Sequence, residues 1–102
     1  AQARLLELTA RDFAPHVGAP FTAEGEDGAS NTLTLKTVTE KPAGKAPFSA
    51  RVPFSLLFDG PAGPGLPDGT YTLSAEGLAP FTVFMTPVVA KDGGRVYQVV
   101  FG

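Results

Sequence analysis

The chain contains no cysteine, and its 102 residues include a single histidine. Without thiols, the sequence excludes disulfide bonds, thiolate metal sites, iron–sulfur clusters and cysteine nucleophiles. A domain of this size can fold without disulfide bonds. The absence of cysteine therefore leaves the location open, either in the cytoplasm or outside the cell as part of an exported assembly.

The chain also lacks an excess of basic residues and long hydrophobic runs. Eight lysines and arginines stand against ten aspartates and glutamates, which gives a formal net charge of −2. Since binding to a phosphate backbone needs clustered positive charge, we expect no nucleic-acid partner. No apolar run approaches the roughly 20 residues that span a bilayer, and none resembles a signal peptide. We therefore expect no membrane insertion.

Glycine and proline are abundant, with 12 and 10 residues. They gather between short apolar runs, which is typical of many strands joined by turns. Hydrophobic residues make up 43% of the chain and charged residues 18%, a balance that favours one folded core over disorder. We predict a single, mainly β domain over residues 1–102. Its architecture would be a small β-sandwich or a partly open β-barrel of about six antiparallel strands, between about residues 20 and 101, with one short N-terminal helix.

The helix signal lies near the N-terminus. Thr9 is a good N-cap, and Asp12 stands three residues later, where its carboxylate can reach back to the cap N–H. The spacing predicts about two helical turns over residues 10–17. Phe13 and Val17 would hold this helix against the core.

The strongest strand signal covers residues 51–58, where apolar residues alternate with other types. Pro53 interrupts this run, which predicts an edge position or a bulge at that point. In the segment 31–40, Val38 falls out of phase with the preceding leucines and predicts a bulge. The expected inward positions of the strand 51–58 are Val52, Phe54, Leu56 and Phe58. Those of the final strand, 95–101, are Tyr97, Val99 and Phe101.

Four blocks of the sequence stand out as a set. They are L-T-A-R-D-F-A-P-H-V-G-A-P-F (Leu8 to Phe21), A-P-F-S-A-R-V-P-F-S-L-L-F-D-G-P (Ala46 to Pro61), L-P-D-G-T-Y-T-L (Leu66 to Leu73) and R-V-Y-Q-V-V-F (Arg95 to Phe101). Together they resemble a family of small bacterial proteins known only as a domain of unknown function. The resemblance implies a β-rich bacterial domain without catalytic residues, associated with genes for phage-tail-like collar or fibre proteins.

The polar residues show no catalytic or metal-binding pattern. His16 has no base or ligand partner close in sequence, and its place at a helix C-terminus favours a structural role. Ser49, Ser55 and Ser74 lack the context of an activated nucleophile. The acids Glu24, Glu26 and Asp27 lie together and could hold a hard cation, but their spacing fits no calcium loop and favours a soluble turn. We therefore expect no enzyme activity, no cofactor and no bound metal.

Three apolar residues lie on the faces opposite the inward positions of their strands. They are Leu57, Phe84 and Val100. If one face of the sheet is wet, they form an exposed patch. The alternative is that the helix or a second sheet covers them. In the Pro/Gly-rich loop 59–69, Leu66 would either meet a partner or pack on its own domain.

These observations favour a non-enzymatic structural or interaction domain. We expect it to be a subunit or accessory of a bacterial multi-subunit assembly, such as a phage-tail-like structure, fibre or appendage. Its partner would be a protein, either a second copy or another component, docked on the apolar face or on the edge of the strand 95–101. The alternative is a binding module for an apolar or carbohydrate ligand. Its cavity would be lined by Phe54, Phe58, Tyr71, Phe81 and Tyr97, although the interior of a six-stranded barrel is filled by side chains alone.

Overall fold

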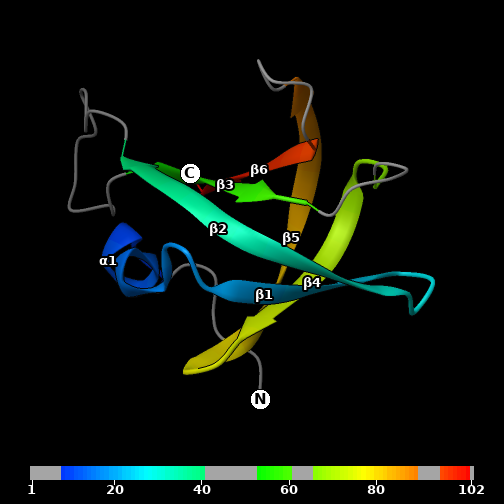
Figure 1. Cartoon of the computed structure of the whole chain (residues 1–102), viewed down its shortest axis with the longest axis horizontal. Coiled ribbons are helices and arrows are strands. Elements are labelled where there is room, and N and C mark those ends of the chain that lie inside the picture. Colours follow the sequence, from blue (N-terminus) through cyan, green and yellow to red (C-terminus); the bar gives the residue numbers. More distant parts are fainter. Residues whose placement is uncertain (1–7, 41–52, 61–65, 90–94, 102) are drawn as a thin grey trace.

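The computed structural model describes residues 8–40, 53–60, 66–89 and 95–101. Six antiparallel strands close into a barrel in the order β1-β2-β3-β6-β5-β4, and β4 pairs back onto β1 (Figure 1). This confirms the prediction of a mainly β fold with one short N-terminal helix, and it selects a closed barrel. The strands are β1 Pro20–Gly25, β2 Ser30–Glu40, β3 Phe54–Asp59, β4 Gly69–Ala75, β5 Leu78–Val89 and β6 Arg95–Phe101.

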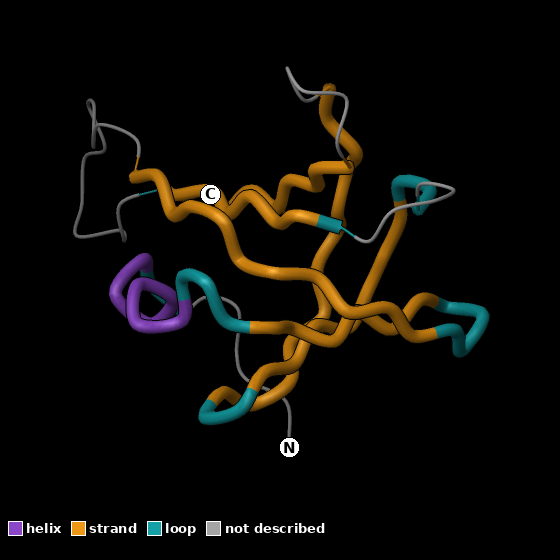
Figure 2. Tube along the Cα trace, viewed as in Figure 1, coloured by secondary structure: helices purple, strands orange, loops and turns teal. Residues whose placement is uncertain are grey.

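The N-terminal helix is shorter than predicted. The α-helix α1 covers Ala10–Phe13, and a 3₁₀ turn, η2, covers Ala14–His16 (Figure 2). The predicted cap is present, since the backbone N–H of Thr9 donates to Oδ2 of Asp12 over 2.8 Å. None of the described helices has the length and apolar character needed to cross a bilayer.

The prediction that Val17 packs on the core is wrong. Its backbone is extended, with φ −61° and ψ 127°, and its side chain is 49% exposed. Pro15 explains the difference, because proline lacks the N–H that an α-helix would donate to the carbonyl of Arg11. The α-helix therefore ends at Phe13, and the chain leaves the 3₁₀ turn before Val17 can reach the core.

The predicted bulge in β2 is confirmed. The pairing of β2 with β3 shifts between Leu35 and Thr37, so that Lys36 is an extra exposed residue. The shift returns Val38 to the inner side, where it is half-buried and packs against the core. The carbonyl of Leu35 accepts a 2.7 Å hydrogen bond from the N–H of Gly18, which ties the segment after the helix to the bulge.

Proline 53 marks neither an edge strand nor a bulge. It lies directly before β3, which pairs with β2 on one side and β6 on the other. The strand begins at Phe54 because Pro53 has no N–H to donate to a ladder. The predicted strand was 51–58, and the observed strand is Phe54–Asp59; Val52 lies outside the described residues.

The final strand is not an edge either. The strand β6 pairs with both β3 and β5, and its Tyr97, Val99 and Phe101 point inward as predicted. The closed barrel leaves none of its six strands with an unpaired side. The ladder with β5 covers residues 95–98, so this part of β6 is not open to strand addition.

Aromatic side chains fill one end of the barrel. The ring of Phe13, carried by α1, lies 5.4–5.8 Å from the rings of Phe54, Phe81 and Phe101. Phe54 and Phe101 stack on each other at 4.5 Å. All four side chains are at most 3% exposed. The short helix thus contributes one ring, that of Phe13, which packs among these aromatic side chains and closes this end of the barrel.

The segment 66–68, which leads into β4, covers the opposite end. The N–H of Leu66 donates to the hydroxyl of Tyr97 over 2.8 Å, and the hydroxyl of Tyr71 donates to the carbonyl of Pro67 over 2.6 Å. The side chain of Leu66 is half-buried and packs against the core. Two tyrosine hydroxyls therefore fix the start of β4 over the barrel.

Candidate functional site

Four neighbouring strands form a wall that is almost free of charge. In β3, β6, β5 and β4 the only charged residues are Asp59, at the end of β3, and Arg95, at the start of β6. The outward positions between them carry threonine, serine, glutamine and apolar side chains. We call the outward side of these four strands the uncharged wall. Depletion of charge is what distinguishes the centre of a protein interface from ordinary surface.

Two of the predicted surface residues are solvent-exposed on this wall. Phe84 is 58% exposed and Val100 is 54% exposed, whereas Leu57 is half-buried. Gln98 of β6 pairs with Leu57 on one side and with Thr86 on the other. Phe84 and Val100 each lie two residues from this row, on the same outward face of adjacent strands. The three apolar residues thus lie around one region of the wall.

The fourth predicted residue, Leu66, is not part of the wall. It lies at the barrel end and packs against the core of its own domain. Sequence reasoning had left open whether its loop contacts a partner or its own barrel. The observed packing, together with the hydrogen bond from its N–H to Tyr97, fits the second interpretation for Leu66.

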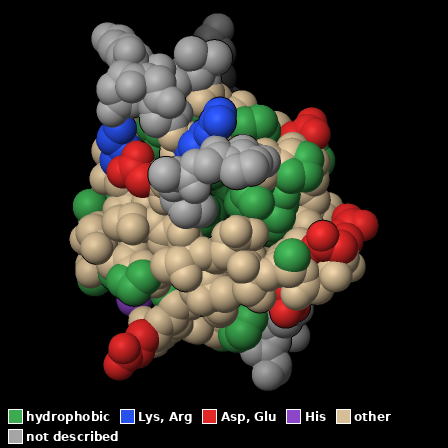
Figure 3. Space-filling view, turned by 45° about the vertical axis from the view of Figure 1, so that its right-hand side comes forward, with side chains coloured by type: hydrophobic (Ala, Val, Ile, Leu, Met, Phe, Trp, Pro, Cys, Tyr) green, Lys and Arg blue, Asp and Glu red, His purple; other side chains and the backbone are tan. Residues whose placement is uncertain are grey.

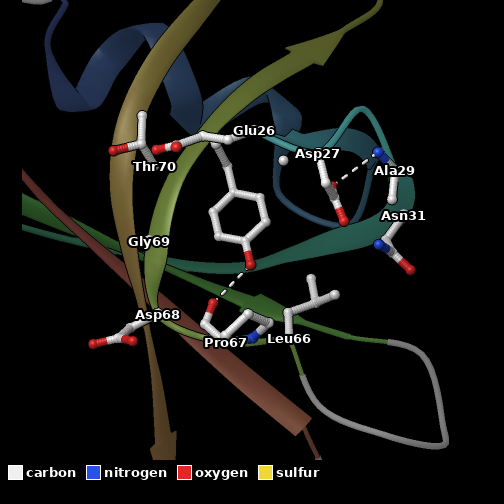
Figure 4. Close-up of a pocket in the computed structure, with 11 residues that line it drawn as sticks. Glu26, Asp27, Ala29, Asn31, Leu66, Pro67, Asp68, Gly69 and Thr70 are labelled. Carbon is white, nitrogen blue, oxygen red and sulfur yellow. Dashed lines mark hydrogen bonds between the residues drawn. The ribbon is translucent and has the colours of Figure 1, made fainter.

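A cavity of about 320 Å³ opens at the barrel end that Leu66 covers. It lies between the turn that joins β1 to β2 and the segment that leads into β4 (Figure 4). It is bounded by Gly25, Glu26, Asp27, Ala29, Asn31, Leu66, Pro67, Asp68, Gly69, Thr70 and Tyr71. On the side of the molecule that carries this turn, acidic side chains lie beside hydrophobic ones (Figure 3).

The turn beside the cavity has a defined geometry. The N–H of Gly28 donates to the carbonyl of Gly25 over 3.0 Å, and Gly28 adopts a φ of +85° that favours glycine. Oδ1 of Asp27 accepts a 3.0 Å hydrogen bond from the N–H of Ala29. Asp27 therefore has a structural role in the turn, whereas Glu26 points toward Thr70 across the cavity (Figure 4).

Tyr71 is the ionisable group that this environment changes most clearly. Burial raises its pKa above the ordinary value of 10.0, and the negative charge that Tyr97, Asp27 and Asp68 can carry raises it further. Tyr71 is consequently neutral at physiological pH. It keeps the proton that it donates to Pro67.

The side chains considered for catalysis belong to different elements. His16 is half-buried with its ring edge-on to Phe21 at 6.1 Å. Ser55 lies in β3 opposite Val100, and Ser74 lies in β4, while Ser49 falls outside the described residues. Within the described ranges, no group of three or more His, Cys, Asp or Glu side chains could hold a metal ion.

The three acids grouped by sequence separate in the fold. Glu24 lies in β1, paired with Ser30 and Thr72, whereas Glu26 and Asp27 lie in the following turn. Asp68, which sequence reasoning assigned to a separate loop, joins Glu26 and Asp27 at the cavity. The pairing of Gly25 with Tyr71 in the barrel makes this possible.

No short-range sequence signal indicates this cavity. Glu26 and Asp68 belong to separate glycine-containing segments, and the sequence of each segment predicts only a solvated turn. The cavity exists because β4 returns to β1 when the barrel closes.

The aromatic residues proposed to line an interior ligand cavity form the core instead. They are Phe54, Phe58, Tyr71, Phe81 and Tyr97, and all are at most 7% exposed. Among these five, only Tyr71 lines the cavity described above.

Comparison with known proteins gives a family and no further relatives. No curated protein matches the chain, and no solved structure does. A family model matches residues 8–101, which covers the four sequence blocks from Leu8 to Phe101. The description of that family names no activity, ligand or assembly, so the association with phage-tail-like genes stays a prediction. The chain belongs to DUF6916, a family defined as a domain of unknown function.

Proposed function

We propose that this domain is a non-catalytic protein-interaction module that docks through the uncharged wall. The observation that carries the proposal is the exposure of Phe84 and Val100 on adjacent strands, 58% and 54% respectively. Burying both against a partner would contribute roughly 3–5 kcal/mol before the cost of association. The wall has charged residues only at its ends, so docking there requires no desolvation of a central charge.

The roles of the polar groups support a non-catalytic domain. Asp12 caps α1, Asp27 orders a turn, and the hydroxyls of Tyr71 and Tyr97 fix the start of β4. Each of these groups is occupied by the fold. In the part of the chain that the structure describes, every buried side-chain nitrogen and oxygen has a hydrogen-bond partner. A poised catalytic group usually departs from this pattern.

We place the module in a bacterial multi-subunit assembly of the phage-tail-like, fibre or appendage type. The support for this setting is the sequence resemblance described above. Because every barrel strand is paired on both sides, docking in such an assembly would use side chains of the wall rather than an added strand. The partner is a protein, either another component or a second copy.

Site-specific photo-cross-linking in the native host tests this proposal. The photoreactive residue p-benzoylphenylalanine replaces Phe84 or Val100 in the full chain, and mass spectrometry identifies the protein joined to it. Replacement of Val17 is the matched control, because Val17 is similarly exposed, at 49%, but follows the helix rather than lying on the wall. We expect one shared partner at 84 and 100 and none at 17. Equal cross-linking at all three positions, or none at 84 and 100, would contradict the proposal.

The alternative of a binding module for an apolar or carbohydrate ligand has less support. Four of its five aromatic residues are packed in the core: Phe54, Phe58, Phe81 and Tyr97. None of these four lines the cavity at the barrel end or a second cavity beside β1 and β4. The second cavity, about 370 Å³, is a wide hollow bounded by Pro20, Thr22, Thr32, Ser74, Ala75 and Glu76. It presents hydroxyls without an aromatic platform for a sugar. We therefore favour the interaction module.

A further inference from the structure

The cavity at the barrel end adjoins the uncharged wall. Thr70 bounds the cavity, and in the β4–β5 ladder it pairs directly with Phe84. Side chains of directly paired residues lie about 5 Å apart at their Cβ atoms. A partner that covers Phe84 therefore also reaches the edge of the cavity.

The described residues around the cavity carry negative charge. Among them are three acids, Glu26, Asp27 and Asp68, and none of these described residues is a lysine, arginine or histidine. Asp27 is engaged by the turn, whereas Glu26 and Asp68 are exposed and make no hydrogen bond or ion pair with the rest of the described chain. The raised pKa of Tyr71, caused first by burial and also by Asp27 and Asp68, agrees with a negative potential at this position.

Glu26 and Asp68 lie together on one side of the cavity. In Figure 4, Glu26 reaches toward Thr70 and Asp68 lies on the same side of β4. Asp27 and Asn31 lie on the other side, with Leu66 below them. Thr70, which pairs with Phe84 of the wall, therefore lies on the same side of this view as both acids.

The size and apolar floor of the cavity suit a long basic side chain. About 320 Å³ is at the lower end of ligand-sized pockets, which range from roughly 300 to 1,000 Å³. Leu66 and the buried ring of Tyr71 supply apolar contact for a methylene stem. Lysine and arginine bury such stems while the charged head stays near carboxylates and water.

We propose that the partner docked on the uncharged wall presents an arginine or lysine next to an apolar side chain. The apolar side chain covers Phe84 and Val100, and the basic side chain enters the cavity between Glu26 and Asp68. This inference rests on the proposed function and specifies the chemistry of its partner.

Two short peptides serve as probes: acetyl-Leu-Arg-Leu-amide and acetyl-Leu-Glu-Leu-amide. Each is titrated to millimolar concentration into the ¹⁵N-labelled full chain, and amide chemical shifts are followed by NMR. We expect the arginine peptide to shift the amides of Thr70, Tyr71 and Phe84, with a Kd about fivefold lower than that of the glutamate peptide. Equal affinity of the two peptides, or shifts away from these residues, would overturn the inference.

Variants separate the charged contact from the apolar one. The double variant Glu26→Gln, Asp68→Asn should remove the preference for arginine, and Phe84→Ser should weaken both peptides. Glu76→Gln is the matched control, because Glu76 is an exposed acid in the β4–β5 turn and does not bound this cavity. Loss of the preference in Glu76→Gln as well would show a general charge effect and overturn the inference.

The outcomes also separate this inference from the function on which it rests. Site-specific cross-links at 84 and 100 with no preference for the arginine peptide would overturn the inference and leave the interaction module intact. Amide shifts of Thr70 and Phe84 that follow the concentration of the chain itself, without peptide, would identify a second copy as the occupant and also overturn it. Absence of both cross-links and peptide shifts would remove the function together with the inference.

Discussion

At the scale of single residues, the barrel end depends on close contacts around Tyr97. Its hydroxyl accepts the N–H of Leu66, and its ring lies against Gly60, the residue after β3. The N–H of Gly60 donates to the carbonyl of Arg95 over 2.7 Å. A Cβ added at Gly60 would lie 2.5 Å from Cε2 of Tyr97, which is closer than van der Waals contact allows. Glycine is needed at position 60 because the ring of Tyr97 leaves no room for a side chain.

Gly60→Ala should therefore destabilise the fold. The ring of Tyr97 is 2% exposed and has little room to move, so we expect a loss of about 1–3 kcal/mol in the free energy of unfolding. Urea denaturation followed by tyrosine fluorescence measures it. Glu76→Ala, at an exposed turn position, should change stability by less than about 0.5 kcal/mol. An unchanged midpoint for Gly60→Ala would show that the contact relaxes freely.

Tyr71 makes the stability of the fold depend on alkaline pH. Its pKa is raised above 10.0 in the folded state, mainly by burial, so the folded chain holds this proton more tightly than the unfolded chain. The resulting stability is fully present below pH 10 and is lost as pH rises through the folded pKa. Wild type should therefore lose more stability above pH 10 than Tyr71→Phe, measured by urea denaturation at a series of pH values. Parallel curves for the two proteins would contradict this assignment.

At the scale of elements, the short helix contributes through one ring. Phe13 is fully buried and contacts three other aromatic rings, whereas Val17, only four residues later, is 49% exposed. A helix of four residues has no stability of its own in water. It persists because Phe13 is inserted into the barrel and because Thr9 and Asp12 cap its first turn.

Substitutions at these two positions should differ sharply in effect. Phe13→Ala leaves a cavity among the aromatic rings, and we expect a loss of about 3–5 kcal/mol in the free energy of unfolding. Val17→Ser replaces an exposed side chain and should change stability by less than about 0.5 kcal/mol. Thermal unfolding followed by circular dichroism compares them. Similar effects of both substitutions would mean that the segment after α1 is also held by packing.

Local chemistry made several elements predictable. The cap at Thr9 and the bulge before Val38 follow from spacings of a few residues, and both are confirmed. The α-helix ends before the predicted Val17 because Pro15 interrupts its hydrogen-bond ladder. The start of β3 was predicted too early for the same kind of reason, at Pro53.

Features that depend on strand order were beyond sequence reasoning. The alternation of apolar residues gives the inward face of each strand but not its neighbours. Closure of the barrel and the cavity beside Glu26 and Asp68 require the pairing of β1 with β4, and the interior position of β6 requires its pairing with β3. The outward positions of Phe84 and Val100 were predictable from the alternation of apolar residues along their strands.

At the scale of the whole molecule, the distribution of charge is uneven. The strands β3, β6, β5 and β4 carry charge only at Asp59 and Arg95, while the other charged side chains of the described residues lie in the helix, in turns and on β1 and β2. An exposed apolar patch within such a wall favours association with another protein. A charge placed at its centre should prevent docking, because a partner would have to bury it unpaired.

The most direct test of the docking wall is the size of the complex that the chain forms in its native host. Tagged wild type, Phe84→Asp and Val17→Asp are compared by size-exclusion chromatography of gently lysed cells. Both variants add one negative charge at a similarly exposed apolar position. We predict that wild type and Val17→Asp elute in a large complex and that Phe84→Asp elutes as a folded monomer. Elution of Phe84→Asp with wild type would contradict docking through the wall.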